Sequence, residues 1–197
     1  MDYDAKTALI VVDVQNDFAD AAGSLYVSGG ETVVPVINGQ ISRAREADAT
    51  VVYTQDWHPE STPHFEKDGG IWPVHCVRDT WGAQFHPDLD VVGPSIRKGT
   101  GGEDGYSGFT VRDPESGKET PTGLGSLLLD AGIEKAVVVG LALDYCVKET
   151  ALDAVAGEFA TTLLTDATAS VNLQPGDDER ALADLEAAGV VLVGSGM

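Results

Sequence analysis

The stretch KAVVVGLALDYCVKETALDA, residues 135–154, joins a short apolar run directly to a helical pattern. The run over 135–141 is rich in β-branched residues, which is typical of a strand buried on both faces of a parallel sheet. The pattern that follows predicts a helix over 145–157, whose apolar face carries Val147, Ala151, Ala154 and Val155. A buried strand that passes straight into a helix is the repeating unit of an α/β fold.

The same unit recurs along the chain. Further apolar runs predict strands over 7–14, 49–55, 94–99, 159–166 and 189–194. Helical patterns between them predict helices over 32–47, 122–131 and 177–188. Because strands and helices alternate, we predict a three-layer, doubly wound α/β fold, with a mostly parallel sheet of about six strands and helices on both faces. A length of 197 residues leads us to expect one domain over 1–197.

The charge argues against two classes of partner. The chain has 32 acidic and 12 basic residues, a formal net charge of -20, and no basic cluster. Nucleic acids and anionic membranes are therefore not expected partners. So acidic a surface is best tolerated where salt screens its self-repulsion, and a high-salt, halophilic source is our hypothesis for it.

The apolar segments and cysteines indicate the compartment. No apolar stretch approaches the roughly 20 residues that span a bilayer, and the start MDYDAKTALIVVD lacks the basic region of a signal peptide. We therefore expect a cytoplasmic protein. Its two cysteines, Cys76 and Cys146, allow at most one disulfide, and we expect free thiols.

Two long segments interrupt the alternation of strands and helices. Residues 56–93 are rich in proline, histidine and tryptophan, and residues 99–121 are rich in glycine and polar side chains. Loops of this length inside a compact domain are usually functional. The glycine-rich segment lacks the Gly-Lys-Ser/Thr ending of a phosphate-binding loop, so nucleotide binding is not expected.

Three reactive side chains lie where predicted strands end: Asp13, Lys98 and Cys146. Ligands of open α/β sheets bind beyond the carboxyl ends of the strands, so these side chains are candidates for one site. A thiol at a helix N-terminus beside a lysine is expected to have a lowered pKa and to act as a nucleophile. Each residue also has a plainer explanation, as a buried small hydrophobe, a turn residue or a solvated lysine.

A candidate metal site lies in the first long segment. Asp56, His58, His64 and His75 offer one carboxylate and three imidazoles, a ligand set that suits Zn, Fe or Mn. Loop histidines are often mere surface residues, but three of the four histidines in the chain lie here, which favours a metal. The fourth, His86, has no obvious co-ligand beside it.

Six motifs carry a family resemblance. They are VVDVQNDF (11–18), DWHP (56–59), WPVHC (72–76), RKG (97–99), GYSGF (105–109) and ALDYCV (142–147). In this order and spacing, the chain resembles the isochorismatase-like hydrolases from about residue 7 to 194, and specifically their nicotinamidase branch. Each motif alone is weakly specific, but six in order are strongly so.

The resemblance implies a role for each matching residue. Asp13, Lys98 and Cys146 match the catalytic triad, and the metal site is matched by Asp56, His58, His64 and His75. The pyridine ring would be enclosed by Phe18, Trp72 and Tyr106. The oxyanion hole would use the backbone N–H groups of Ala142 and Cys146, with a cis peptide at Leu141–Ala142. The implied cofactor is one divalent metal ion, with zinc as first choice and iron or manganese as alternatives.

The implied activity is hydrolysis of nicotinamide to nicotinic acid and ammonia through a cysteine thioester, as part of NAD salvage. Pyrazinamide is implied as a further small amide substrate, and a homo-oligomer stays open. Many relatives carry histidine immediately before the nucleophile, where this chain has Tyr145. We expect Tyr145 to contact substrate through its hydroxyl or ring edge.

Three alternatives are compatible with parts of the pattern. An amidase that acts on an N-carbamoyl or ureido compound would share the triad, but such enzymes generally lack the metal cluster. Isochorismatase proper cleaves a vinyl ether and does not need the cysteine. A non-catalytic metal-binding or redox module, with Cys76 and Cys146 as redox partners, belongs to a different class altogether.

Overall fold

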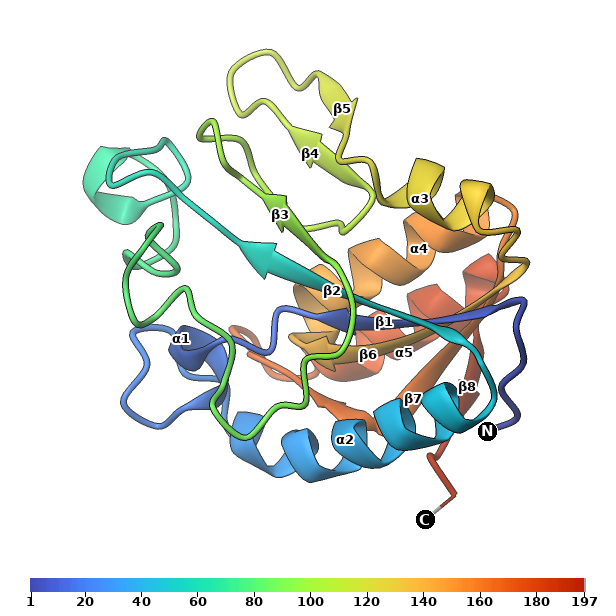
Figure 1. Ribbon diagram of the computed structural model, residues 1–197. Helices are drawn as coiled ribbons and strands as arrows, with labels where there is room; N and C mark the ends of the chain where they lie inside the picture. Colours follow the sequence, from blue (N-terminus) through green and yellow to red (C-terminus); the bar gives the residue numbers. More distant parts are fainter. Residues whose placement is uncertain (197) are drawn as a thin grey trace.

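The computed structural model describes residues 1–196, which are built around one parallel six-stranded sheet (Figure 1). The strands are β1 (Thr7–Val12), β2 (Thr50–Asp56), β3 (Ser95–Lys98), β6 (Lys135–Leu141), β7 (Ala160–Ala169) and β8 (Val191–Val193). Their spatial order is β3-β2-β1-β6-β7-β8, and every neighbouring pair in this sheet is parallel. The predicted fold class is confirmed, and all six predicted strands are present.

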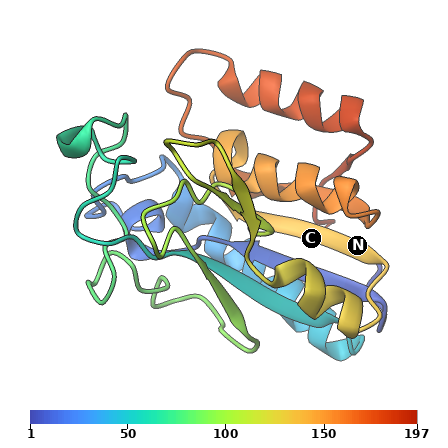
Figure 2. The ribbon, with the colours of Figure 1, turned by 90° about the horizontal axis from the view of Figure 1, so that it is seen from above.

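Helices cover both faces of the sheet. One face is covered by α2 (Gly30–Glu46), and the other by α3 (Leu124–Asp130), α4 (Lys148–Ala156) and α5 (Asp177–Ala188). Figure 2 shows α4 and α5 on one side of the strands and α2 on the other. None of the helices within residues 1–196 is long and apolar enough to cross a membrane.

The alternation of side chains along β1 explains the two apolar layers. Leu9 and Val11 pack in the cluster that contains α2, whereas Ala8 and Ile10 pack in the cluster that contains α3, α4 and α5. All of β1 is buried, because successive residues of a strand point to opposite faces and both faces are covered. The wholly apolar runs in the sequence follow from this double coverage.

The structure corrects the start of the helix predicted over 145–157, which is α4, and adds short elements. A π-helical turn, η2 (Leu143–Val147), precedes α4, so the regular helix begins at Lys148 rather than at 145. The added elements are α1 (Asn16–Ala19), the 3-10 turn η1 (Glu66–Asp68) and the antiparallel pair β4 (Thr110–Arg112) and β5 (Glu119–Pro121). Elements of three or four residues are too short to show a periodic apolar pattern.

The order of the strands determines where a ligand can bind. From β1 the chain moves through β2 to β3 on one side, whereas β6, β7 and β8 follow on the other side. From the carboxyl ends of β1 and β6 the chain therefore continues in opposite directions along the sheet. This makes the gap between the two strand ends a topological switch point, which is where α/β sheets bind ligands. Asp13 follows β1 at this point, and Ala142 follows β6. The long segment after β2 lies beyond the same edge (Figure 1).

Close packing of β1 against β6 requires a glycine next to the switch point. Gly140 has φ +115°, and a Cβ atom there would lie 2.1 Å from the carbonyl oxygen of Val12. A side chain at this position would therefore strain the backbone and displace a neighbouring strand.

We expect Gly140→Ala to lower the free energy of unfolding by at least about 2 kcal/mol, because it combines a disfavoured φ with a backbone clash. Urea unfolding followed by tryptophan fluorescence measures this. Gly125→Ala is the matched control, since Gly125 lies inside α3 and its added Cβ would be an ordinary 3.7 Å from Phe109. The control should raise stability by up to about 1 kcal/mol. Equal losses in both variants would contradict the close approach at Gly140.

Candidate active site

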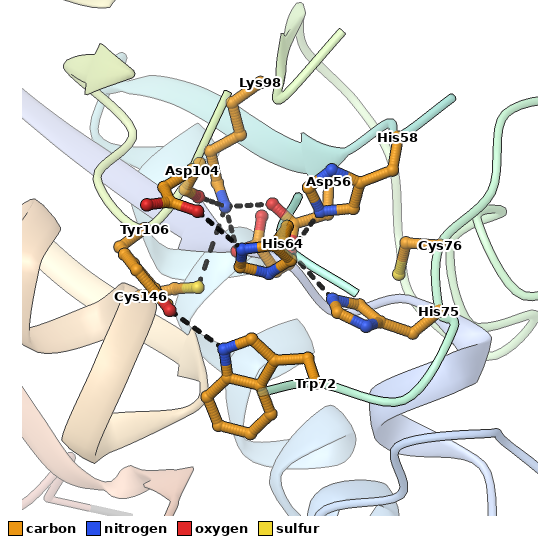
Figure 3. Close-up of polar contacts among 12 residues, drawn as sticks. Asp56, His58, His64, Trp72, His75, Cys76, Lys98, Asp104, Tyr106 and Cys146 are labelled. Carbon is orange, nitrogen blue, oxygen red and sulfur yellow. Dashed lines mark hydrogen bonds and ion pairs between the residues drawn. The ribbon is translucent and has the colours of Figure 1, made fainter. Parts of the chain in front are cut away.

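Three side chains from three strand ends meet at the switch point. The Nζ atom of Lys98 lies 2.7 Å from Oδ2 of Asp13 and 3.7 Å from Sγ of Cys146. Lys98 ends β3, Asp13 follows β1 and Cys146 lies in η2, after β6. The fold therefore brings the three candidate catalytic residues together, although they are far apart in sequence. Figure 3 shows Lys98 beside Cys146.

Asp13 is held in a strained and fully buried position. Its φ is +49°, and its Oδ1 accepts a 2.6 Å hydrogen bond from the hydroxyl of Thr54. Burial, opposed by Lys98 and assisted by Asp56, raises the pKa of Asp13 to about 6. A carboxyl group with such a pKa is suited to accept and donate a proton near neutral pH.

Lys98 is a buried cation between two carboxylates. Its ammonium group contacts Asp13 and Asp56 and donates to the backbone carbonyl of Gly105. Burial alone would lower the pKa of Lys98, but the two carboxylates raise it well above its usual value. Lys98 therefore stays charged and serves as a fixed positive charge beside the thiol.

The predicted lowering of the Cys146 pKa is wrong for the resting site. Burial raises the pKa of Cys146 well above its usual value, because the lowering effect of Lys98 is countered by Asp13 and Asp56. The thiol also lies in the π-helical turn rather than in the first turn of α4. Cys146 is therefore protonated at rest, and ionisation needs a base. Acceptor atoms of Asp13 and Asp56 lie within 4.8 Å of Sγ.

The three histidines of the first long segment converge beside this triad. One ring nitrogen from each of His58, His64 and His75 lies within 4.8 Å of the others. Oδ2 of Asp56 lies 3.8 Å from Nε2 of His58 and 3.9 Å from Nε2 of His75. Figure 3 shows the rings grouped around the Asp56 carboxylate. All four predicted metal ligands are thus in one buried cluster.

Hydrogen bonds of the rings fit a bound divalent metal. Nδ1 of His75 pairs with the carbonyl of Pro73 at 2.7 Å, which leaves Nε2 with a free lone pair. Within residues 1–196, neither ring nitrogen of buried His58 has a hydrogen-bond partner. Such a ring would be costly to bury without a ligand. Three imidazoles and a carboxylate form a ligand set suited to zinc or iron.

Glycine at the end of the RKG motif makes room for His58. Gly99 has φ +70°, and a Cβ atom there would lie 2.6 Å from Cε1 of the His58 ring. The RKG motif therefore contributes to both the triad and the histidine cluster. Lys98 belongs to the triad, and Gly99 leaves room for the His58 ring in the cluster.

The backbone of Asp56 is held by a side chain that sequence analysis missed. The Gln15 amide donates to the Asp56 carbonyl at 2.8 Å and accepts from the Asp56 N–H at 2.8 Å. Burial alone would raise the pKa of Asp56, but Lys98 and the adjacent histidines hold it well below its usual value. Asp56 is therefore an anionic group shared by the triad and the histidine cluster.

A pocket with about 400 Å³ of empty space, part of it open to solvent, leads to these groups. Its walls include the four predicted substrate-binding side chains, Phe18, Trp72, Tyr106 and Tyr145, together with Ala142, Cys146, Asp56, His64 and His75. Trp72 donates its indole N–H to the Tyr106 hydroxyl at 2.8 Å. The Tyr145 ring packs edge-on against Trp72, with 4.8 Å between the ring centroids. The Leu141–Ala142 peptide at its base is cis, as expected.

The alternative of a redox module, with Cys76 and Cys146 as partners, is not supported by a disulfide between them. Cys76 and Cys146 are both free, as predicted, and both are buried. Figure 3 shows the two thiols on opposite sides of the histidine cluster. The arrangement of Cys146 therefore suits catalysis rather than disulfide exchange with Cys76.

Several residues of the site carried no sequence signal. Leu25 and Val171 line the pocket, and Asp104 contacts His64. Leu25 and Val171 are ordinary apolar residues outside any motif, and Asp104 is one of 32 acidic residues. Only Gln15, which lies inside the VVDVQNDF motif, could have been noticed.

Comparisons with known proteins concern the family and the fold of the chain. The isochorismatase domain family matches residues 7–195. A nicotinamidase/pyrazinamidase of Mycobacterium tuberculosis is 40% identical over 190 residues, covering 94% of this chain and 97% of that protein. The zinc complex of a Pyrococcus horikoshii pyrazinamidase has a TM-score of 0.85 at 39% identity, covering 96% of this chain and 99% of that one. PnC1 from L. infantum, in complex with nicotinate, has a TM-score of 0.90 at 39% identity, and the match covers 99% of this chain and 96% of that one.

The histidine cluster makes a prediction about metal content. His58→Ala should reduce zinc retained after dialysis by at least about tenfold, because it removes one of the three candidate imidazole ligands. His86→Ala is the control, since His86 is the histidine outside the cluster. Elemental analysis measures both. Retention of zinc by His58→Ala, or equal loss in His86→Ala, would show that the metal binds elsewhere.

Proposed function

The chain belongs to the isochorismatase domain family, and we propose that it is a nicotinamidase, which hydrolyses nicotinamide to nicotinic acid and ammonia. The resemblance drawn from the six motifs is confirmed at the level of the family. The observation that carries the proposal is one aromatic-walled pocket that contains both the Cys146 thiol and the edge of the three-histidine cluster. A thiol and a metal site in the same pocket suit hydrolysis of an amide attached to a metal-binding ring.

The first half of the proposed reaction forms a thioester. Asp13 accepts the proton of the Cys146 thiol, and the thiolate, beside the Lys98 ammonium 3.7 Å away, attacks the carboxamide carbon. The C–N bond then breaks, and Asp13 returns the proton to the departing nitrogen, which leaves as ammonia. The raised pKa of Asp13, about 6, supports this alternation between base and acid.

The second half of the reaction releases nicotinic acid. Asp13 takes a proton from water, which attacks the thioester carbon, and the C–S bond breaks to give the carboxylic acid. The thiolate of Cys146 regains the proton from Asp13. In both halves we assign the oxyanion to the backbone N–H groups of Ala142 and Cys146, where each donor typically lowers the barrier by about 3 kcal/mol.

The metal would be held by Asp56, His58, His64 and His75, and we propose zinc, as in the Pyrococcus horikoshii relative. When bound, it would supply a Lewis acid that orients and polarises the ring nitrogen of the substrate. Phe18, Trp72 and Tyr106 would enclose the ring. The hydrogen bond between the Trp72 indole and the Tyr106 hydroxyl supports a preformed slot for a flat ring.

Nicotinic acid as product fits a role in NAD salvage. We also propose pyrazinamide as a substrate, because its ring has the same size and carries a nitrogen at the corresponding distance from the carboxamide. The alternative of an N-carbamoyl or ureido substrate leaves the histidine cluster without a role, so we do not favour it.

Ammonia release from nicotinamide tests the proposal. Cys146→Ala should lower kcat at least about a thousandfold, because it removes the nucleophile, and Cys146→Ser should be nearly as damaging. Cys76→Ser is the control, since Cys76 is the other buried thiol and lies outside the pocket. Undiminished ammonia release by Cys146→Ala would exclude the thioester mechanism.

A substrate panel separates the proposal from its alternatives. We expect the enzyme to prefer nicotinamide and pyrazinamide over benzamide and an N-carbamoyl amino acid, to lose activity on chelation and to recover it with zinc. Benzamide is the informative comparison, since it has the carboxamide but lacks the ring nitrogen. Preference for the carbamoyl compound with indifference to chelation would contradict the nicotinamidase proposal.

Tyr145 makes a prediction about the size of accepted rings. Tyr145 lines both the pocket and an adjacent polar hollow with about 970 Å³ of empty space, as does Tyr106, so the two rings lie between these spaces. We expect Tyr145→Ala to raise kcat/KM for quinoline-3-carboxamide relative to nicotinamide by roughly tenfold, a size typical of pocket discrimination. Tyr145→Phe, which keeps the ring, should leave the ratio unchanged. An unchanged ratio in Tyr145→Ala would show that the wall is elsewhere.

A further inference from the structure

The histidines of the cluster differ in what holds their second ring nitrogen. His75 uses a carbonyl only two residues away, that of Pro73, and His58 has no partner among the described residues. His64 instead contacts a carboxylate 40 residues further along the chain, with its Nδ1 2.8 Å from Oδ1 of Asp104. Among these ring nitrogens turned away from the cluster, only that of His64 meets a charged side chain.

The contact with Asp104 sets the orientation of the His64 ring. A carboxylate accepts hydrogen bonds, so the proton of His64 lies on Nδ1 and the lone pair lies on Nε2. His64 is 6% exposed and the Asp104 side chain 23% exposed, so the hydrogen bond is largely shielded from water. Outer carboxylates of this kind fix the tautomer and direction of metal-binding histidines in proteins.

The backbone of Asp104 is itself held firmly. Asp104 and Arg112 form an antiparallel bridge, in which the Asp104 N–H donates at 2.8 Å and the Arg112 N–H donates back at 2.9 Å. Arg112 is the last residue of β4, which pairs with β5. The short hairpin missed by sequence analysis therefore fixes the position of the Asp104 carboxylate.

Segment 104–106 also contacts the rest of the site. The carbonyl of Gly105 accepts from the Lys98 ammonium, and the hydroxyl of Tyr106 accepts from the Trp72 indole. One short segment thus touches a candidate metal ligand, the catalytic lysine and the pocket wall in turn. Displacement of Asp104 would be opposed by all of these contacts, so the carboxylate is preorganised.

The charges in this region favour a divalent cation. Two carboxylates, those of Asp13 and Asp56, pair with the single ammonium of Lys98, and a third, that of Asp104, contacts His64 of the cluster. The excess of two negative charges is offset by a divalent ion. Asp104 therefore contributes to binding through its charge as well as through its hydrogen bond.

We propose that Asp104 is a positioning residue of the metal site, which holds the His64 ring in the metal-binding tautomer and direction. The inference rests on the metal role of the histidine cluster proposed above. It makes the affinity for a divalent cation depend on a residue that does not itself touch the ion.

Zinc affinity of the chelator-stripped protein tests the proposal, by competition with a chromophoric chelator in the absence of substrate. Asp104→Ala removes both the hydrogen bond and the charge and should weaken zinc binding by about 10- to 100-fold. Asp104→Asn keeps an oxygen acceptor but loses the charge, so its affinity should lie between Asp104→Ala and wild type. Glu103→Gln is the matched control, because it removes a neighbouring charge whose side chain, within residues 1–196, accepts a hydrogen bond from the Gly101 N–H and forms no ion pair, and it should bind zinc like wild type.

Two further readouts exclude a merely structural effect. Thermal unfolding of the metal-free variants should match that of the metal-free wild type within a few degrees, and the visible spectrum of the cobalt-loaded Asp104→Ala protein should change because the His64 ligand is released. Should Asp104→Ala unfold, Asp104→Asn decides. Wild-type zinc affinity in Asp104→Asn and in any folded Asp104→Ala, or an equal loss in Glu103→Gln, would overturn the proposal. No substrate is used, so failure of nicotinamide hydrolysis would leave this result intact.

Discussion

The ion-pair cluster of Lys98 with Asp13 and Asp56 is the interaction on which the site depends. All three side chains are buried, and a charge in such surroundings is tolerated only when it is paired and hydrogen-bonded. Lys98 meets both requirements through the two carboxylates and the Gly105 carbonyl. Because Asp13 belongs to the candidate triad and Asp56 to the histidine cluster, one ammonium group joins the two halves of the site and fixes their spacing.

Burial and neighbouring charges shift the pKa of each group in the site in a different direction or to a different extent. Burial makes Asp13 a proton acceptor near neutral pH and keeps the Cys146 thiol protonated until a base removes its proton. Asp56 stays anionic because of Lys98 and the histidines, and Gln15 holds its backbone in place. The acid–base behaviour of the site is therefore a property of the buried ensemble rather than of any residue alone. For this reason the position of Cys146 before a helix does not lower the pKa of its thiol.

Much of the fold and most of the candidate site were predictable from sequence. Strands buried on both faces are apolar throughout, so the six strands of the sheet appear as short β-branched runs, and the motifs at their ends mark Asp13, Lys98 and Cys146. The residues that were missed act through contacts with distant parts of the chain. Asp104 reaches His64 across 40 residues, and Gln15 reaches Asp56 across 41. Gln15 lies inside the VVDVQNDF motif, but no local pattern reveals that its partner is Asp56 or that Asp104 meets His64, and in so acidic a chain another aspartate is not informative.

The sequence by itself determined the class of fold, the family and the chemical groups available, because apolar periodicity and residue type are local properties of the chain. Only the tertiary structure decided that burial raises the pKa of the Cys146 thiol, that Lys98 pairs with both Asp13 and Asp56 and that Asp104 contacts His64. These facts depend on burial and on distances between residues from different strands and loops. Burial and distance are set by how the layers pack, and that information is spread over the whole chain rather than contained in any motif.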